Sequence, residues 1–228
     1  KTTEKPEMVN IFTPQSVSTQ PEIEFWVWGD SNARGCFNTG NGGFGSHGSI
    51  WFWLNFTTNK VINIYNMGAS SEVISSALTP NQWHHFRVKL VTSSTFEVWL
   101  DGVSLGIHNQ FVSESSVDRL CFAALDTTSS FYLYIDAIDY SWAPGYYTSR
   151  NMEYGPVDYL GLYSFTDDAV GGDPAGWTVT EPVDTHMDVV LAKDNHRKVV
   201  EMYKTTEKPE MVNIFTPQSV STQPEIEF

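Results

Sequence analysis

Short apolar runs separated by turn-forming residues fill most of this 228-residue chain. Within many runs apolar and polar residues alternate, and the gaps hold Gly, Pro, Asn, Asp, Ser and Thr, which is typical of strands joined by turns. No long helical periodicity interrupts the pattern. The predicted strands are residues 22–28, 49–56, 60–66, 72–78, 83–91, 96–100, 119–125, 131–138, 162–165, 176–179, 187–191 and 198–203. The pattern predicts an all-β fold with two antiparallel sheets packed as a sandwich.

A perfect repeat is the most unusual feature of the chain, because residues 1–25 recur unchanged as residues 204–228. Such identity implies a recent tandem duplication, a window on a chain of 203-residue repeats, or deliberate engineering. Each copy holds two strand-like stretches, so the two copies compete for one place in a sheet. Exchange of that segment between molecules, or covalent joining of such repeats in a tandem array, predicts head-to-tail assembly into a filament. The apolar residues expected to carry it are Val9, Ile11, Phe12, Ile23 and Phe25, with their copies Val212, Ile214, Phe215, Ile226 and Phe228.

The domain order predicted from composition is circularly shifted. Residues 143–158 are rich in Gly, Pro and polar residues and are interpreted as a linker or inter-repeat loop. A natural domain then starts near Val157, with residues 159–203 as its opening strands and residues 1–142 as its larger part. Residues 204–228 are the second copy and the candidate for exchange.

Three ordered segments carry a resemblance to a known family. They are Pro-Glu-Ile-Glu-Phe-Trp-Val-Trp at 21–28, Asn-Gln-Trp-His-His-Phe-Arg-Val at 81–88 and Val-Trp-Leu-Asp-Gly-Val at 98–103. They resemble laminin-G and concanavalin A-like lectin domains, and residues 134–139 and 163–177 look like the closing and opening strands of similar modules. The resemblance implies a concanavalin-like jelly-roll sandwich, as a unit of a tandem-repeat protein that is extracellular or at the cell surface.

The resemblance also implies a candidate metal site, because related modules often carry a structural calcium ion where the opening and closing strands meet. The acids available at that junction are Asp167, Asp168, Asp173, Asp136 and Asp139. Calcium takes six to eight oxygen ligands in flexible geometry, which such a cluster can supply. The alternative is that these are solvated loop acids.

The net charge indicates which partners are not expected, and the cysteines and one sequon indicate candidate modifications. With 27 acidic and 13 basic residues the formal charge is -14, which repels phosphate backbones, so nucleic acid is not an expected partner. No apolar run reaches the roughly 20 residues of a membrane-spanning helix, and membrane insertion is not expected. Cys36 and Cys121 are a disulfide candidate, and Asn55 heads the only glycosylation sequon.

No convincing catalytic set is found in the sequence. Glu22 and Glu24 are similar to the paired acids of concanavalin-like glycoside hydrolases, but the further acid expected on the same strand is replaced by Phe, Trp and Val. The chain is therefore not expected to be an enzyme. The leading hypothesis is an extracellular structural or adhesive repeat module that binds copies of itself. The alternative is a carbohydrate-binding module for cell-surface glycans, using residues 38–47 and Tyr146 with Tyr147, and a glycan-cleaving enzyme is the third reading.

Overall fold

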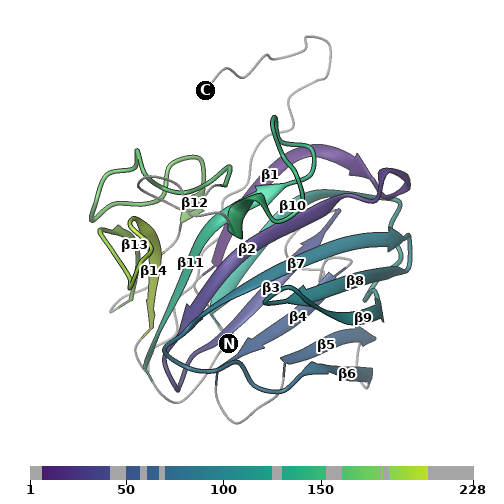
Figure 1. Cartoon of the computed structure of the whole chain (residues 1–228), viewed down its shortest axis with the longest axis horizontal. Helices are drawn as coiled ribbons and strands as arrows, with labels where there is room; N and C mark the ends of the chain where they lie inside the picture. Colours follow the sequence, from purple (N-terminus) through teal and green to yellow (C-terminus); the bar gives the residue numbers. More distant parts are fainter. Residues whose placement is uncertain are drawn as a thin grey trace.

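Two seven-stranded antiparallel sheets lie one behind the other in the computed structural model (Figure 1). The structure describes residues 7–41, 50–56, 61–66, 70–124, 130–152, 161–179, 181 and 185–204. Sheet A has the order β12-β1-β10-β3-β4-β5-β6 and sheet B the order β13-β14-β11-β2-β7-β8-β9. The predicted all-β sandwich is therefore confirmed. Among the described residues, no helix is long and apolar enough to cross a membrane.

The strand bounds follow in chain order. They are β1 Glu7–Ser16, β2 Glu22–Gly29, β3 Arg34–Gly40, β4 Ile50–Asn55, β5 Val61–Asn66, β6 Ser70–Ser75, β7 Trp83–Thr92, β8 Thr95–Leu100, β9 Val103–Asn109, β10 Ser116–Ala124, β11 Phe131–Tyr140, β12 Thr178–Val179, β13 His186–Val190 and β14 Val199–Lys204. Two single-turn 3-10 helices, η1 Val17–Thr19 and η2 Arg150–Met152, complete the described elements.

Several elements differ from the sequence prediction, which also lacked β9. Strand β3 was not predicted, since its Gly, Cys and Asn residues give a weak strand signal, yet it pairs with both β10 and β4. The two strand-like stretches of the first repeated segment form β1 and the start of β2, and β1 runs through Pro14 with a shift of register between Ile11 and Gln15. Residues 162–165 form no strand, and only Tyr163 bridges to Ile138.

The core lies between the sheets and is centred on aromatic side chains. On β2, Ile23, Phe25 and Val27 are fully buried because alternate residues of a strand point to the same face. The Phe25 ring stacks on Phe37 of sheet A at 5.0 Å and on Phe86 of β7 at 5.4 Å, between ring centroids. The apolar row of β2 therefore joins the two layers.

The chain crosses from sheet A to sheet B through η1. The side chain of Ser16 caps η1 by accepting the Ser18 amide, and Gln20 closes it in the left-handed region at φ 50°. Pro21 then leads into β2, and its carbonyl accepts the Leu90 amide at 3.0 Å. This crossing brings the end of β1 beside the start of β2, where the candidate site lies.

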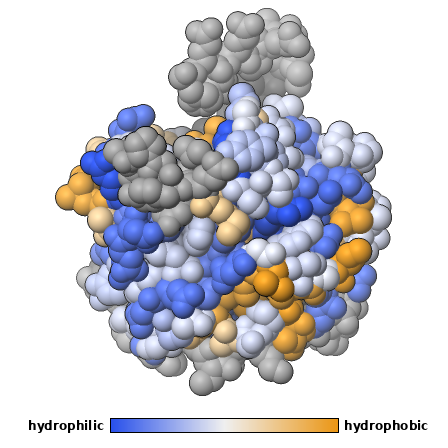
Figure 2. Space-filling model, in the orientation of Figure 1, coloured by the Kyte–Doolittle hydropathy of each residue, from blue (hydrophilic) through white to orange (hydrophobic). Residues whose placement is uncertain are grey.

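The far edge of sheet B is apolar at its surface. Val103 and Ile107 on β9 are 64% and 61% exposed. Figure 2 shows apolar residues over this side of the molecule, around β8 and β9. The hairpin between β8 and β9 turns at Asp101 and Gly102, which both have positive φ, as the Asp-Gly sequence predicts.

We expect Phe25→Ala to lower the free energy of unfolding by about 3–5 kcal/mol, because it leaves a cavity in a stacked aromatic core. Urea denaturation measures this change directly. The exposed Val103→Ala is the matched control, expected to change stability by less than about 0.5 kcal/mol. Equal effects of the two changes would contradict the described core.

Candidate functional site

The outer face of sheet B is polar and carries the candidate site. Since β2 sends Ile23 and Phe25 into the core, it presents Glu22 and Glu24 on the opposite face. Residues 141–152, here called the cover segment, follow β11 and pack over these two carboxylates. The contacts of Tyr146 and Ser149 with Glu24 hold the cover segment in place.

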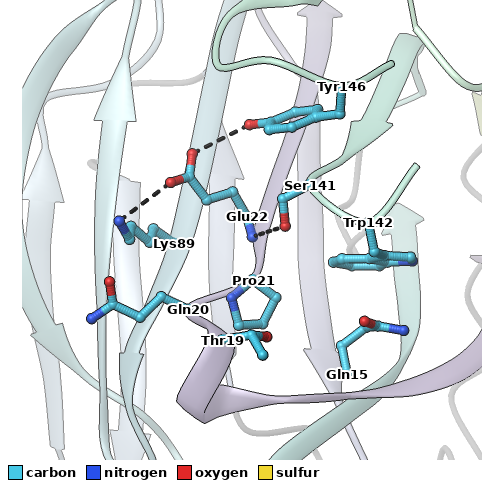
Figure 3. Close-up of a pocket in the computed structure, with 9 residues that line it drawn as sticks. All are labelled: Gln15, Thr19, Gln20, Pro21, Glu22, Lys89, Ser141, Trp142 and Tyr146. Atoms are coloured by element: carbon cyan, nitrogen blue, oxygen red, sulfur yellow. Dashed lines mark hydrogen bonds and ion pairs between the residues drawn. The ribbon is translucent and has the colours of Figure 1, made fainter. Parts of the chain in front are cut away.

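A groove of about 430 Å³ lies where the β1–β2 crossing meets the cover segment (Figure 3). Its lining is mostly polar, and Figure 3 shows Glu22 at the middle, between Lys89 on β7 and Tyr146 of the cover segment. Trp142 lines the groove near Gln15. The lining residues are Gln15, Thr19, Gln20, Pro21, Glu22, Lys89, Ser141, Trp142 and Tyr146.

Glu22 is surrounded by donors. Its carboxylate accepts Arg87 Nε at 2.8 Å and the Tyr146 hydroxyl at 3.2 Å, and Lys89 Nζ lies 3.4 Å away. Its backbone amide donates to Ser141 Oγ at 2.9 Å. Although Glu22 is only 8% exposed, these partners compensate its negative charge. The groove therefore offers an acceptor and cationic donors side by side.

Glu24 lies deeper and is fully buried. It accepts the Tyr146 hydroxyl at 2.6 Å and the Ser149 amide at 2.8 Å, and His85 Nε2 lies 3.1 Å from its other oxygen. Burial acts to raise the pKa of Glu24, but these hydrogen bonds outweigh it and hold that pKa below its ordinary value. Burial, together with the hydrogen bond to Glu24 and the negative charge of that carboxylate, raises the pKa of Tyr146.

A second carboxylate anchors the cover segment from β11. Asp139, opposite Glu24 in the strand register, accepts Arg150 Nε at 2.8 Å and Nη2 at 2.7 Å. Burial raises the pKa of Asp139 despite Arg150, and the nearby Glu24 adds to that rise. The Asn151 side-chain oxygen accepts His85 Nε2 at 2.7 Å, and its backbone carbonyl accepts Trp26 Nε1 at 2.7 Å.

His196 packs against sheet B at Trp83 of β7. Its ring stacks on Trp83 with centroids 3.9 Å apart, and its Nδ1 is hydrogen-bonded to Asp136. Burial lowers the pKa of His196 to about 3, so the imidazole is neutral and donates its Nδ1 proton to Asp136.

The five acids predicted to bind calcium are divided between two environments. Asp136 and Asp139 are buried and paired with His196 and Arg150, while Asp167 and Asp173 are exposed. In the loop of Asp168, the ammonium of Lys198 donates to the carbonyls of Thr166 and Asp168. Asp136 and Asp139 thus already have partners among the described residues, and calcium binding by the five carboxylates stays a prediction.

One different acidic group is found among the described residues. Asp173, Glu181 and Asp188 place one oxygen each within 4.8 Å of one another. Sequence reasoning included Asp173 but missed the other two. Exposed acids often gather without an ion, so this geometry alone assigns no calcium site.

The cysteines and the sequon lie in sheet A. Cys36 and Cys121 are both buried and lie diagonally across the β3–β10 pair, and a disulfide between them stays a prediction. Asn55 is fully buried, and its side-chain oxygen accepts Arg34 Nε at 3.1 Å. A glycan on Asn55 would have to be attached before this sheet forms.

The predicted assembly residues also fall into different environments. Ile23 and Phe25 belong to the core, Val9 and Phe12 are partly buried, and Ile11 is 47% exposed. β1 turns Ile11 to the outer face of sheet A, whereas Met8 faces the core. The copies at 212, 214, 215, 226 and 228 lie outside the described residues.

The predicted sugar-contacting residues are partly recovered. Tyr146 lines the groove, whereas Tyr147 is 48% exposed beside it. Of residues 38–47, the structure describes 38–41, and Asn38 is buried in β3. Sequence reasoning missed Trp142, Lys89 and Gln20, because they meet only through the sheet crossing. The density of aromatic residues in 140–147, which overlaps the predicted linker 143–158, was the available signal.

Comparison with known proteins finds only distant likeness. No family model matches the chain, and no curated protein matches it. A homodimeric agglutinin from chicken liver, CG-16, aligns with a TM-score of 0.46 and 11% identity over 59% of this chain and 99% of its own. Galectin LEC-6 of Caenorhabditis elegans aligns with a TM-score of 0.38 and 14% identity, over 52% of this chain and 91% of its own. A sialidase aligns with a TM-score of 0.44 and 10% identity, over 90% of this chain and 14% of its own.

These identities and scores assign no function to the chain, and a laminin-G relationship stays a prediction.

Acid stability tests the state of His196. The unfolded chain protonates this residue below its ordinary pKa of 6.5, whereas the folded imidazole stays neutral down to about 3. The unfolded state therefore binds more protons, and the free energy of unfolding falls as the pH falls, by at most about 1.4 kcal/mol per pH unit. We expect His196→Asn, which keeps a donor for Asp136, to flatten this slope between pH 6 and pH 4 in urea denaturation. Equal slopes would contradict a neutral, buried His196.

Proposed function

We propose that this protein is a carbohydrate-binding module, the alternative among the sequence-based hypotheses, and that the groove beside Glu22 is its binding site. The observation that carries the proposal is the lining, which combines Trp142 with amide, hydroxyl, ammonium and carboxylate groups. An aromatic ring supplies apolar contact for the C–H face of a sugar, while its neighbours pair with hydroxyls. The ring is held in place by Tyr140, stacked at 4.7 Å, and Phe12 at 4.8 Å.

The mixed charge of the groove favours a neutral ligand. Lys89 and Arg87 oppose a cationic ligand, and Glu22 together with the formal charge of -14 opposes an anionic one. Gln15 and Gln20 each offer a donor and an acceptor, as does a sugar hydroxyl. A neutral oligosaccharide with vicinal hydroxyls therefore suits these groups best.

Binding without cleavage fits the placement of the acids. Glycoside hydrolysis needs two carboxylates on either side of the scissile bond, about 5–9.5 Å apart. Among the residues described as lining the groove, Glu22 is the one acid, and Glu24 is fully buried below Tyr146. We infer that Glu24 positions the cover segment and has no contact with a ligand.

We expect Trp142→Ala to weaken binding of neutral oligosaccharides at least about tenfold, equivalent to about 1.4 kcal/mol of lost contact. A glycan array identifies the ligand, and calorimetry with that ligand measures the affinity. Tyr147→Ala is the matched control, since this exposed aromatic belongs to the same segment but does not line the groove. Binding that survives Trp142→Ala unchanged, or an unmodified protein that binds no glycan, would contradict the proposal.

A second candidate function, a structural or adhesive repeat unit, rests on a separate observation. The repeated sequence forms β1, η1 and the start of β2, and contributes Gln15, Thr19, Gln20, Pro21 and Glu22 to the groove. A spare copy of such a segment can pair with a neighbouring molecule. Both functions suit a protein outside the cell or at its surface, which we propose as its location.

Assembly of this kind depends on concentration. We expect light scattering of the full chain to show a mass that grows with protein concentration, and negative-stain microscopy to show linear particles. A single monomer mass throughout the range would exclude assembly by exchange and leave the sugar-binding proposal untouched.

A further inference from the structure

Strand β14 ends at the same end of the sandwich at which β1 begins. Lys204, the last residue of β14, lies opposite Phe131 at the start of β11. Glu7, the first residue of β1, lies opposite Ala123 at the end of β10. Because β10 leads directly into β11, these two positions share one end of the two-layer structure. Lys204 is also the first residue of the second copy, equivalent to Lys1.

The place of β1 in sheet A is specific for its sequence. It lies between β10 and β12, with Met8 fully buried in the core. The Asn10 amide donates to the Tyr163 hydroxyl at 2.9 Å, and Phe12 packs on Tyr140 and Trp142. The second copy has the same residues in the same order, at 211, 213 and 215.

The crossing after β1 is a natural point of exchange. Ser18, Thr19 and Gln20 are exposed, and they separate β1 in sheet A from β2 in sheet B. Replacement of β1 alone therefore leaves the buried strand β2 intact. Exchange at such a hinge is the usual low-cost route by which identical elements replace one another.

We propose that residues 210–219 fill the place of β1 as an alternative to residues 7–16 of the same chain. Five residues, 205–209, separate Lys204 from the equivalent of Glu7. Six residue steps span up to about 20 Å, which is about twice the spacing of about 10 Å between packed sheets. The replacement strand enters in the direction of β1, because β14 arrives at the end where β1 starts.

The exchange has a consequence for the groove. Gln218 then takes the position of Gln15, so the lining keeps its chemistry whichever copy is in place. Either copy of the repeated segment can thus supply the strand between β10 and β12, and the copy not in use is free to pair elsewhere. This inference does not depend on sugar binding.

Disulfide trapping in the full chain tests the proposal. Val9 lies directly opposite Cys121 in the register, where facing Cβ atoms are close to disulfide distance. In a Cys36→Ala background, V9C reports the first copy at the β1 place and V212C reports the second. M211C is the matched control, because its equivalent, Met8, faces the core opposite Phe122.

We expect mild oxidation of monomeric protein to give an intramolecular bond to Cys121 with V9C and with V212C, in yields within about tenfold of each other, since identical strands differ only in the entropy of closing their connections. M211C should give at least about tenfold less than V212C, because its thiol faces away from Cys121. Peptide mapping by mass spectrometry measures the yields, and circular dichroism checks each fold.

Two results would overturn the proposal. One is a V212C yield no higher than that of M211C while V9C reacts with Cys121. The other is a V212C bond to Cys121 found only in disulfide-linked dimers, which favours exchange between molecules. Neither result bears on oligosaccharide binding in the groove.

Discussion

The two faces of β2 impose opposite requirements on the structure. One face sends Ile23, Phe25 and Val27 into the aromatic core, and the other therefore buries Glu22 and Glu24 against the outside of sheet B. A buried carboxylate without partners is costly, so each of these acids needs donors from elsewhere. β7 supplies Arg87 and His85, and the cover segment supplies Tyr146 and the Ser149 amide.

The groove follows from this compensation of charge. Because Glu24 and Asp139 fix Ser149 and Arg150, the cover segment stays on sheet B and holds Trp142 and Tyr146 at the β1–β2 crossing. The acids that anchor the segment are fully buried, which leaves Glu22 and Lys89 at the groove. The groove is therefore shaped by the contacts that compensate buried charge.

Most strands of the two sheets could be predicted from the sequence, because a strand has a local pattern of apolar and polar residues. Alternation along residues 22–28 and 83–91 and the Asp-Gly turn at Asp101 need no distant information. Strand β3 was missed because its stability comes from pairing on both sides. Its own residues have low strand preference.

The site was less predictable because it depends on register between distant strands. Asp139 looked like a metal ligand until its position opposite Glu24 and beside Arg150 was known. In the same way, residues 143–158 have the composition of a linker, yet Tyr146, Ser149 and Arg150 are bound to buried carboxylates. Composition does not show which polar residues will have a buried charge to neutralise.

Amide hydrogen exchange at Ser149 tests most directly whether buried Glu24 holds the cover segment. The Ser149 amide donates to Glu24 at 2.8 Å, so it should be protected in the unmodified protein and exchange rapidly in Glu24→Ala. The amides that pair β10 with β3, on the other sheet, should stay protected in both proteins. Slow exchange at Ser149 in the variant would contradict the dependence of the groove on Glu24.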